Sequence, residues 1–407
     1  MNDENHAPLE GLRLTEFTSA WAGPYASCLL ALLGMEVIKV ETSTWLDHTR
    51  TRSFSTGRIF TGPDESAVFN HLNLNKKSVT LNLKKPKAVE LARKLAAVSN
   101  VVMENMRPGV MERLGLDYEV IRQVKPDIVY LSSSSCGQCG PQREYVGYAP
   151  TFAALGGVSL NTGYEDGPPS AILGVIDLRS ATTAAGAVLA GLLYHQRTGK
   201  GQYLDLASQE SIAVLNGEAL MDYFLNDRVR TRRGNKDDAM APHNCYRCAG
   251  DDNWISIAVA TDGEWQALCQ AMNRTELVND PRFAGREARL RNQAELDKII
   301  AAWTRNQDYY QVMELLQGVG VAATPSLSAK ALFSDAHIKQ RGIFRQVAHP
   351  NLGQNWVLAP PWQLSETPGG IRQHGPLMGQ HNEEICQGLL GLSPEEFEAL
   401  KEEEVFL

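Results

Sequence analysis

The residue best placed for chemistry is Asp177, a carboxylate between an apolar run and a long helical pattern. The apolar run covers Ala171–Ile176, and apolar residues then recur at three- and four-residue spacings as far as Leu192. Gly199 is a typical left-handed stop for this helix, and Arg197 lies near its negative end. Unsatisfied N–H groups at a helix N-terminus favour an ionised carboxylate. Asp177 is therefore either a simple helix cap or an anion available for catalysis.

Cysteines form a second group of reactive residues. The chain holds seven, and two pairs have C-x-x-C spacing: Cys136 with Cys139, and Cys245 with Cys248, the latter near His243. Such pairs can bind zinc or carry out redox chemistry. An odd cysteine count in a long chain favours a reducing compartment. A predicted domain boundary separates the two pairs, so we expect no metal site.

The composition restricts the class of partner. The 407 residues include 39 Lys and Arg against 47 Asp and Glu, which gives a net charge of −8. This balance argues against nonspecific binding to nucleic acid or to a membrane surface. The acidic, polar first residues do not resemble a secretory signal, and the uncharged run Ser180–Tyr194 is shorter than a membrane span. We expect a cytoplasmic globular protein with no nucleic-acid or membrane partner.

The elements that position these residues alternate between strands and helices. The predicted strands cover residues 12–17, 37–41, 75–83, 101–105, 128–134 and 203–206, and the predicted helices include 22–34, 84–98 and 117–124. This order predicts an α/β fold: a large domain with an open, doubly wound, Rossmann-like parallel sheet. The first strand-to-helix turn reads S-A-W-A-G-P, not G-x-G-x-x-G, and no phosphate-binding G-x-x-x-x-G-K-[ST] occurs. Nicotinamide and nucleoside-triphosphate enzymes are therefore disfavoured.

The composition changes near residue 226, where a charged, turn-rich stretch begins. We predict three parts: residues 1–225 form the first part of the large domain, 226–330 a smaller α+β domain, and 331–407 a return segment that completes the large domain. In open parallel sheets ligands bind at the carboxyl ends of the strands. Four segments that follow strands should therefore meet at one crevice: Ser19–Ala22, Lys84, Asn105–Arg113 and Ser135–Pro141.

These same segments resemble the motifs of the family III CoA-transferases. The similar motifs are A-G-P at Ala22–Pro24, N-K-x-S-x-x-L-x-L-K at Asn75–Lys84, E-N-x-x-P-G-x-x-x-R-x-G at Glu104–Gly115 and T-G-x-G-Q at Thr198–Gln202. The resemblance extends over nearly the whole chain and places Asp177 at the position of the family's nucleophilic aspartate.

The resemblance implies a site for coenzyme A or an acyl-CoA as substrate, with no tightly bound cofactor. It implies that CoA is contacted by these residues: Ser19, Ala20, Trp21, Ala22, Leu81, Lys84, Asn105, Met106 and Arg113. Lys and Arg suit the phosphates of CoA because they donate charge-assisted hydrogen bonds. Each position also has a structural alternative: Leu81 and Trp21 could be core residues, and Lys84 and Arg113 could be solvated surface residues.

The family mechanism implies covalent catalysis, in which Asp177 forms a mixed anhydride and then an aspartyl-CoA thioester. Backbone N–H groups of Gly137 and Gln138 are the expected oxyanion donors. The family's S-G-F-G-Q loop, expected over the thioester, reads S-S-C-G-Q here and so differs at two positions. Trp21 and Tyr148 are expected beside the acyl group. Within the family the chain resembles the F subunit of benzylsuccinate CoA-transferase, which implies benzylsuccinate or a related aryl or dicarboxylic acid as acceptor and succinyl-CoA as donor.

Two alternatives remain open within this fold. α-Methylacyl-CoA racemases pair the aspartate with a histidine in a G-H-D segment, whereas this chain has Gly147, Tyr148 and Ala149 there. Tyrosine is a poor proton acceptor at neutral pH, which favours the transferase. The other alternative is a non-catalytic CoA-binding subunit. The family assembles as interlocked dimers, so we expect a homodimer or a hetero-oligomer with a homologous subunit.

Overall fold

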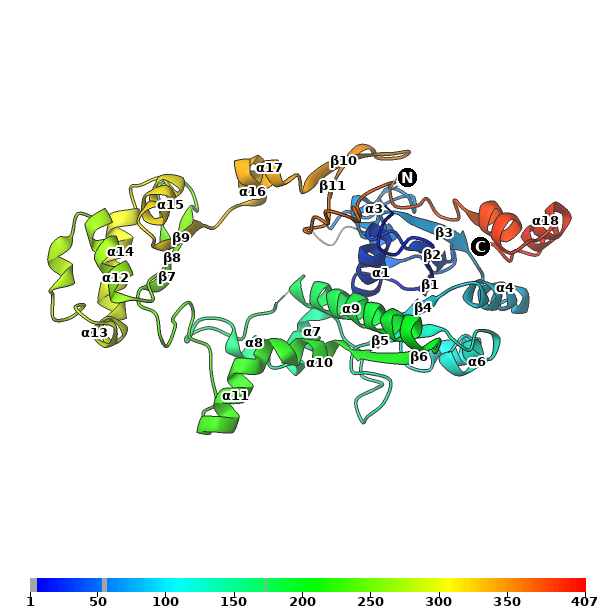
Figure 1. Ribbon diagram of the computed structural model, residues 1–407, viewed down its shortest axis with the longest axis horizontal. Coiled ribbons are helices and arrows are strands. Elements are labelled where there is room, and N and C mark those ends of the chain that lie inside the picture. Colours follow the sequence, from blue (N-terminus) through cyan, green and yellow to red (C-terminus); the bar gives the residue numbers. More distant parts are fainter. Residues whose placement is uncertain (1–5, 53–56, 173) are drawn as a thin grey trace. The chain divides into compact units, whose positions relative to one another are not determined.

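The computed structural model describes residues 6–52, 57–172 and 174–407, which form two compact units (Figure 1). The large unit comprises Met1–Ser159, Ala171–Arg230 and Lys339–Leu407. The small unit comprises Leu160–Ser170 and Thr231–Ile338. The sequence places limits at residues 225 and 330 and gives no sign of the segment 160–170. A change in composition marks the long linker near residue 226, whereas no such change marks the short segment 160–170 of the small unit.

The large unit is built on a six-stranded parallel sheet with the order β3-β2-β1-β4-β5-β6. Its strands are β1 (Arg13–Phe17), β2 (Glu36–Glu41), β3 (Lys76–Thr80), β4 (Val101–Glu104), β5 (Val129–Ser134) and β6 (Gln202–Ala207). The predicted doubly wound α/β fold is therefore confirmed. Strand order reverses between β1 and β4, where Phe17 pairs with Glu104, and such a switch point is where open sheets bind ligands.

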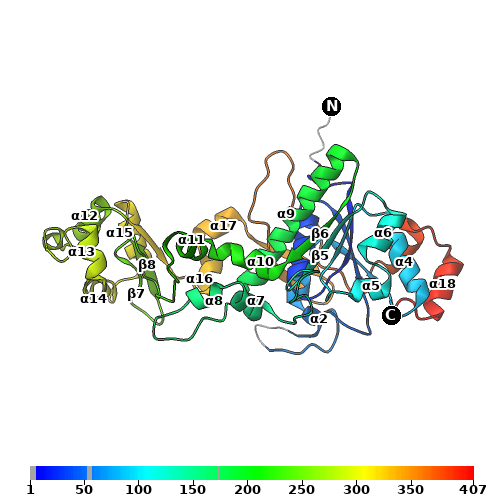
Figure 2. The ribbon, with the colours of Figure 1, turned by 90° about the horizontal axis from the view of Figure 1, so that it is seen from below.

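Two helices cover one face of this sheet. Helices α1 (Ala22–Leu32) and α9 (Val175–Thr198) lie side by side against it (Figures 1 and 2). Their buried small residues, such as Ala26 on α1 and Ala181 and Ala184 on α9, allow close packing. Helix α9 leads into β6, which runs parallel to β5, so α9 begins at the carboxyl edge of the sheet.

The opposite face is covered by α4 (Pro86–Ala97), α6 (Tyr118–Val124) and the C-terminal segment. The other elements of this unit are α2 (His48–Thr51), α3 (Ala67–Leu72), α5 (Val110–Leu114), α7 (Ala149–Leu155), α10 (Ser208–Ala213), a 3₁₀ turn (Val214–Asn216), α11 (Gly217–Asn226), the hairpin β10 (Phe344–His349) and β11 (Gly353–Leu358), a π-helical turn (Glu384–Leu389) and α18 (Pro394–Glu402). Helices α2 and α3 lie in a stretch that the sequence indicates as loop.

The small unit has its own core, built on an antiparallel sheet with the order β7-β8-β9. Its elements are β7 (His243–Arg247), β8 (Trp254–Ala258), α12 (Asp262–Ala271), a 3₁₀ turn (Thr275–Val278), α13 (Arg286–Arg291), α14 (Gln293–Thr304), α15 (Tyr309–Gly318), β9 (Ala322–Pro325) and α16 (Ala329–Ser334). The helices α8 (Val158–Asn161) and α17 (Ala336–Arg341) span the limits between the units. Trp265 and Phe283 form the centre of this core.

Helix α9 is long and apolar enough to cross a membrane by length and composition alone, although the sequence predicts no span of that length. Its residues Ala181, Ala184, Val188 and Leu192 are buried in the cluster that packs against the sheet. We therefore interpret α9 as the core helix of the large unit.

Candidate active site

The loop after β1 and the end of β4 meet at the switch point of the sheet. The amide of Asn105 donates to the Ser19 carbonyl at 2.9 Å, and its Oδ1 accepts from the Ser19 N–H at 2.8 Å. Gly23 packs so closely here that a Cβ atom would come within 2.8 Å of the Asn105 side chain. Two segments predicted to bind CoA are thus joined by a pair of hydrogen bonds.

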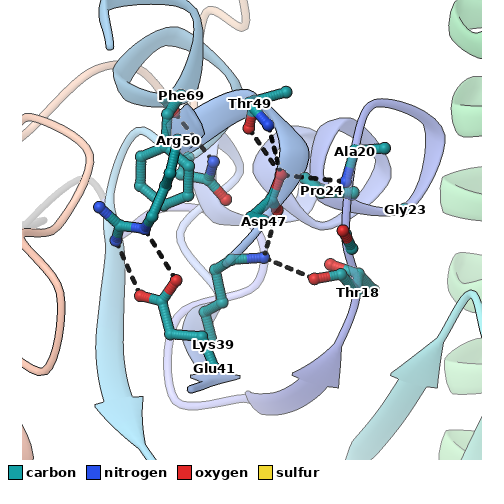
Figure 3. A network of polar contacts seen from close by, with 12 residues as sticks. Thr18, Ala20, Gly23, Pro24, Lys39, Glu41, Asp47, Thr49, Arg50 and Phe69 are labelled. Carbon is teal, nitrogen blue, oxygen red and sulfur yellow. Dashed lines mark hydrogen bonds and ion pairs between the residues drawn. The ribbon is translucent and has the colours of Figure 1, made fainter. Parts of the chain in front are cut away.

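A buried charge cluster that sequence patterns barely indicate supports this loop from beneath (Figure 3). Lys39, on β2, donates to the Thr18 carbonyl at 2.6 Å and lies 3.3 Å from an oxygen of Asp47. The other oxygen of Asp47 accepts from the N–H of Ala20 at 3.2 Å. Burial lowers the pKa of the Lys39 ammonium, but the carboxylates of Asp47 and Glu16 outweigh it and leave that pKa raised. The signal in the sequence is a lysine between two apolar residues, Ile38 and Val40, of a predicted strand.

Asp177 lies in the first turn of α9, after Gly174, which precedes the helix with a φ of 76°. The side chain is half-buried, and no hydrogen bond or ion pair joins it to another described residue. Burial raises the pKa of this carboxyl, whereas the sequence led us to expect that the helix N-terminus would favour the anion. The cause of this rise is desolvation, which disfavours the charged carboxylate. A more basic carboxylate that carries no partner is suited to nucleophilic attack.

The residue before Asp177 packs against α7. Ala149 and Ala153 on α7 pack in one cluster with Ile176, the residue before Asp177. Tyr148 precedes α7 and is 71% exposed. Tyr148 and Asp177 are thus each adjacent in the chain to a residue of one small apolar cluster, Ala149 and Ile176.

The loop after β5 does not present the N–H of Gln138 as a free oxyanion donor, which the mechanism requires. Gly137 adopts a φ of 83°, and the N–H of Gln138 donates to both oxygens of Asp205 on β6 at 3.0 Å. The Ser135 carbonyl accepts from the N–H of Gln209 at 2.9 Å. The Gln138 N–H would therefore have to leave Asp205 before it could stabilise an oxyanion.

The remaining predicted CoA contacts separate into surface and core. Lys84 and Arg113 are exposed and form no ion pair with other described residues, so both cations are free to meet phosphate. Trp21, directly before α1, and Met106, after β4, are half-buried. Leu81 is 1% exposed inside the core cluster of the α4 face. The side chain of Leu81 is thus part of the core and has almost no free surface.

A cavity of about 220 Å³ lies beside β4, β5 and β6. Glu104, Ser132, Gln138 and Tyr203 are among the residues that line it. Burial, with the Asp205 carboxylate adding to it, raises the pKa of Glu104 to about 7. The sequence did not single out Glu104 as a titratable group, because it stands there only as the first residue of the motif at Glu104–Gly115.

The cysteine pairs lie in different units of the structure. Cys136 and the exposed Cys139 belong to the loop after β5, whereas Cys245 and the buried Cys248 lie on and after β7. All seven cysteines are free thiols. Within residues 6–52, 57–172 and 174–407, no three His, Cys, Asp or Glu side chains are grouped as metal ligands.

Comparison with known proteins gives a consistent result. The sequence profile of CoA-transferase family III matches residues 9–382. A succinyl-CoA–D-citramalate CoA-transferase of Chloroflexus aurantiacus is 37% identical over 98% of both chains. A succinyl-CoA:glutarate CoA-transferase of Mus musculus is 33% identical over 94% of this chain and 86% of its own. The crystal structure of a CAIB/BAIF family protein from Brucella suis superposes with a TM-score of 0.85, at 28% identity over 94% of this chain and 100% of the other.

Proposed function

Because the chain belongs to CoA-transferase family III, we propose that it moves CoA from an acyl-CoA donor to a carboxylic acid with Asp177 as nucleophile. The observation that carries this proposal is the half-buried Asp177 carboxylate, which has no partner among the described residues and begins α9 at the carboxyl edge of the sheet. A carboxylate that served only as a cap or an ion-pair partner would have its oxygens occupied.

The exchange follows in four steps, each of which balances. Asp177 attacks the donor thioester, which forms a mixed anhydride and releases the CoA thiolate. The thiolate attacks the aspartyl carbonyl, which leaves an aspartyl-CoA thioester and the free donor acid. The acceptor carboxylate attacks this thioester, which forms a second anhydride and frees the thiolate again. The thiolate then attacks the acceptor carbonyl and restores the Asp177 carboxylate.

We propose succinyl-CoA as donor and a dicarboxylic acid as acceptor. The two relatives described above are named for succinyl-CoA, citramalate and glutarate, and both of these acceptors are dicarboxylates. Benzylsuccinate, the acceptor that the sequence suggested, belongs to the same chemical class. Trp21, half-buried beside the loop after β1, would provide a flat surface for an aryl group.

The assembly that we propose is a dimer, either with a second copy or with a homologous subunit. Apolar side chains of α11 remain on the surface of the chain, with Phe224 69% and Leu225 73% exposed. Exposed apolar patches of this kind are typical of protein–protein interfaces.

The test is a mass-spectrometric screen of succinyl-CoA against citramalate, glutarate and benzylsuccinate, followed by hydroxylamine trapping. We expect new acyl-CoA products, and a hydroxamate on the peptide that contains Asp177. Asp177→Asn should lower kcat by roughly a thousandfold or more, because the nucleophile is lost. Glu395→Gln, which removes an exposed first-turn carboxylate of α18, should leave the rate unchanged.

Two results would overturn the proposal. One is normal exchange by Asp177→Asn. The other is deuterium exchange at the α-carbon of an acyl-CoA without any acceptor acid, since this reaction is the signature of the racemase alternative.

A further inference from the structure

We infer that two buried lysine–carboxylate pairs, Lys39–Asp47 and Lys76–Glu16, hold the Thr18–Pro24 loop, taken to include the first residues of α1, in the shape that binds CoA, with Asp47 as its positioning residue. This inference rests on the proposed function only for the identity of the ligand, CoA. The restraint on the loop is a property of the fold and can be measured without substrate.

The two lysines hold the two ends of the loop. Lys39 donates to the Thr18 carbonyl at 2.6 Å, and Lys76 donates to the Pro24 carbonyl at 2.7 Å. Both lysine side chains are fully buried, and Lys76 also lies 2.8 Å from Glu16. Because buried ammonium groups need every available acceptor, these contacts are costly to break.

Between these ends the backbone adopts a conformation that needs support. Ala20 has a φ of 67°, in the left-handed region, which is unfavourable for a residue with a Cβ. Its N–H donates to Oδ1 of Asp47, which also accepts from the N–H and hydroxyl of Thr49 (Figure 3). A charge-assisted hydrogen bond at this N–H offsets the strain and fixes the direction of the loop.

Asp47 is itself held in place by the next element. It caps α2, and Arg50 of that helix donates to Glu41 at 2.8 and 2.9 Å and to Asp64 at 2.6 Å. The Arg50 guanidinium also stacks on Phe69 at 3.5 Å from the ring centroid. Arg50 therefore fixes α2 in the unit, and Asp47 at the start of α2 fixes the backbone at Ala20.

The first measurement is hydrogen–deuterium exchange of the peptide that contains Ala20, in the full chain without substrate. Asp47→Ala should increase exchange of this peptide by about tenfold, and Asp47→Asn by about threefold, since a neutral amide is a weaker acceptor than a carboxylate. The matched control is Asp308→Ala, which removes an aspartate that caps α15 through two N–H groups in the small unit. We expect this control to leave the Ala20 peptide unchanged.

The second measurement is binding of CoA itself by calorimetry, together with steady-state kinetics. Asp47→Ala should weaken CoA binding and raise KM for the donor by about tenfold, while kcat changes by less than about threefold, because Asp47 does not touch the reacting atoms. If Asp47→Ala does not fold, Asp47→Asn is used, with an expected effect of about threefold.

The outcomes separate the two proposals. Unchanged exchange at Ala20, or unchanged CoA affinity in a variant with faster exchange, would overturn the positioning role. A wild-type chain that binds no CoA would refute the proposed function, while the exchange result would still show whether Asp47 restrains the loop.

Discussion

At the scale of single residues, Glu104 is a buried carboxyl whose pKa the fold raises into the neutral range. It is 3% exposed at the end of β4, its Oε2 accepts from the N–H of Met106 at 2.7 Å, and its pKa is raised to about 7 from an ordinary 4.5. A raised pKa means that the folded chain holds the proton more tightly than the unfolded chain. The stabilisation of the folded chain by the protonated Glu104 is thus complete below pH 4.5 and is lost as the pH rises through about 7.

We therefore predict that Glu104→Gln, which imitates the protonated side chain, gains stability relative to the wild type as the pH rises from 5 to 8. The gain should approach about 3 kcal/mol, the free energy that corresponds to the shift in pKa. Urea unfolding of both chains at pH 5, 6, 7 and 8 measures it. A difference that stays constant across this range would contradict the prediction.

At the scale of elements, the contact between α9 and the sheet depends on one small residue. A Cβ atom on Gly191 would come within 2.8 Å of Val129 Cγ1 and 3.4 Å of Leu204 Cδ1. Gly186, on the same helix, is exposed and would meet nothing within 4 Å. The two glycines therefore form a matched pair, in which helix propensity is the same and only the packing differs.

Gly191→Ala should destabilise the chain by about 1–3 kcal/mol, because extra volume in a packed contact forces the helix away from β5. Gly186→Ala should instead stabilise it by up to about 1 kcal/mol, since alanine favours the helix over glycine. Chemical denaturation of the two variants gives both values. If Gly191→Ala were as stable as Gly186→Ala, the close approach of α9 to the sheet would be refuted.

At the scale of the whole molecule, the apolar surface of α11 needs a partner. Met221, Phe224 and Leu225 follow a helical spacing and are 53%, 69% and 73% exposed. Monomers rarely leave such side chains together on the surface. Of the two dimers proposed above, the one with a second copy of the chain on this face can be tested directly.

The double variant Phe224→Glu, Leu225→Glu should shift the chain from dimer to monomer, because it places two charges in an apolar contact. Val98→Glu changes a side chain that is 41% exposed at the end of α4 and is the control, with no expected change of assembly. Sedimentation velocity distinguishes the species. A wild-type chain that sediments as a monomer would contradict the proposal.

The sequence determined the elements and their order, since periodicity, glycine stops and turn residues act over a few positions. It indicated β1 to β6, α1, α4, α6 and α9, and hence the parallel sheet and the edge at which ligands bind. It also indicated Asp177 at the start of α9, because the carboxylate and the helix that follows are neighbours in the chain. The family itself could be recognised from motifs that lie within single segments.

Only the tertiary structure decided which side chains are buried and what they contact, because these depend on residues distant in the chain. Leu178 and Leu189 of α9 fit the apolar periodicity yet are 38% and 37% exposed, while Gly191 is buried. Leu81 proved to be core, and the Gln138 N–H is occupied by Asp205, 67 residues away. A buried charge is stable only where the fold brings it a partner, so no local pattern could show that Lys39 would meet Asp47 beneath Ala20.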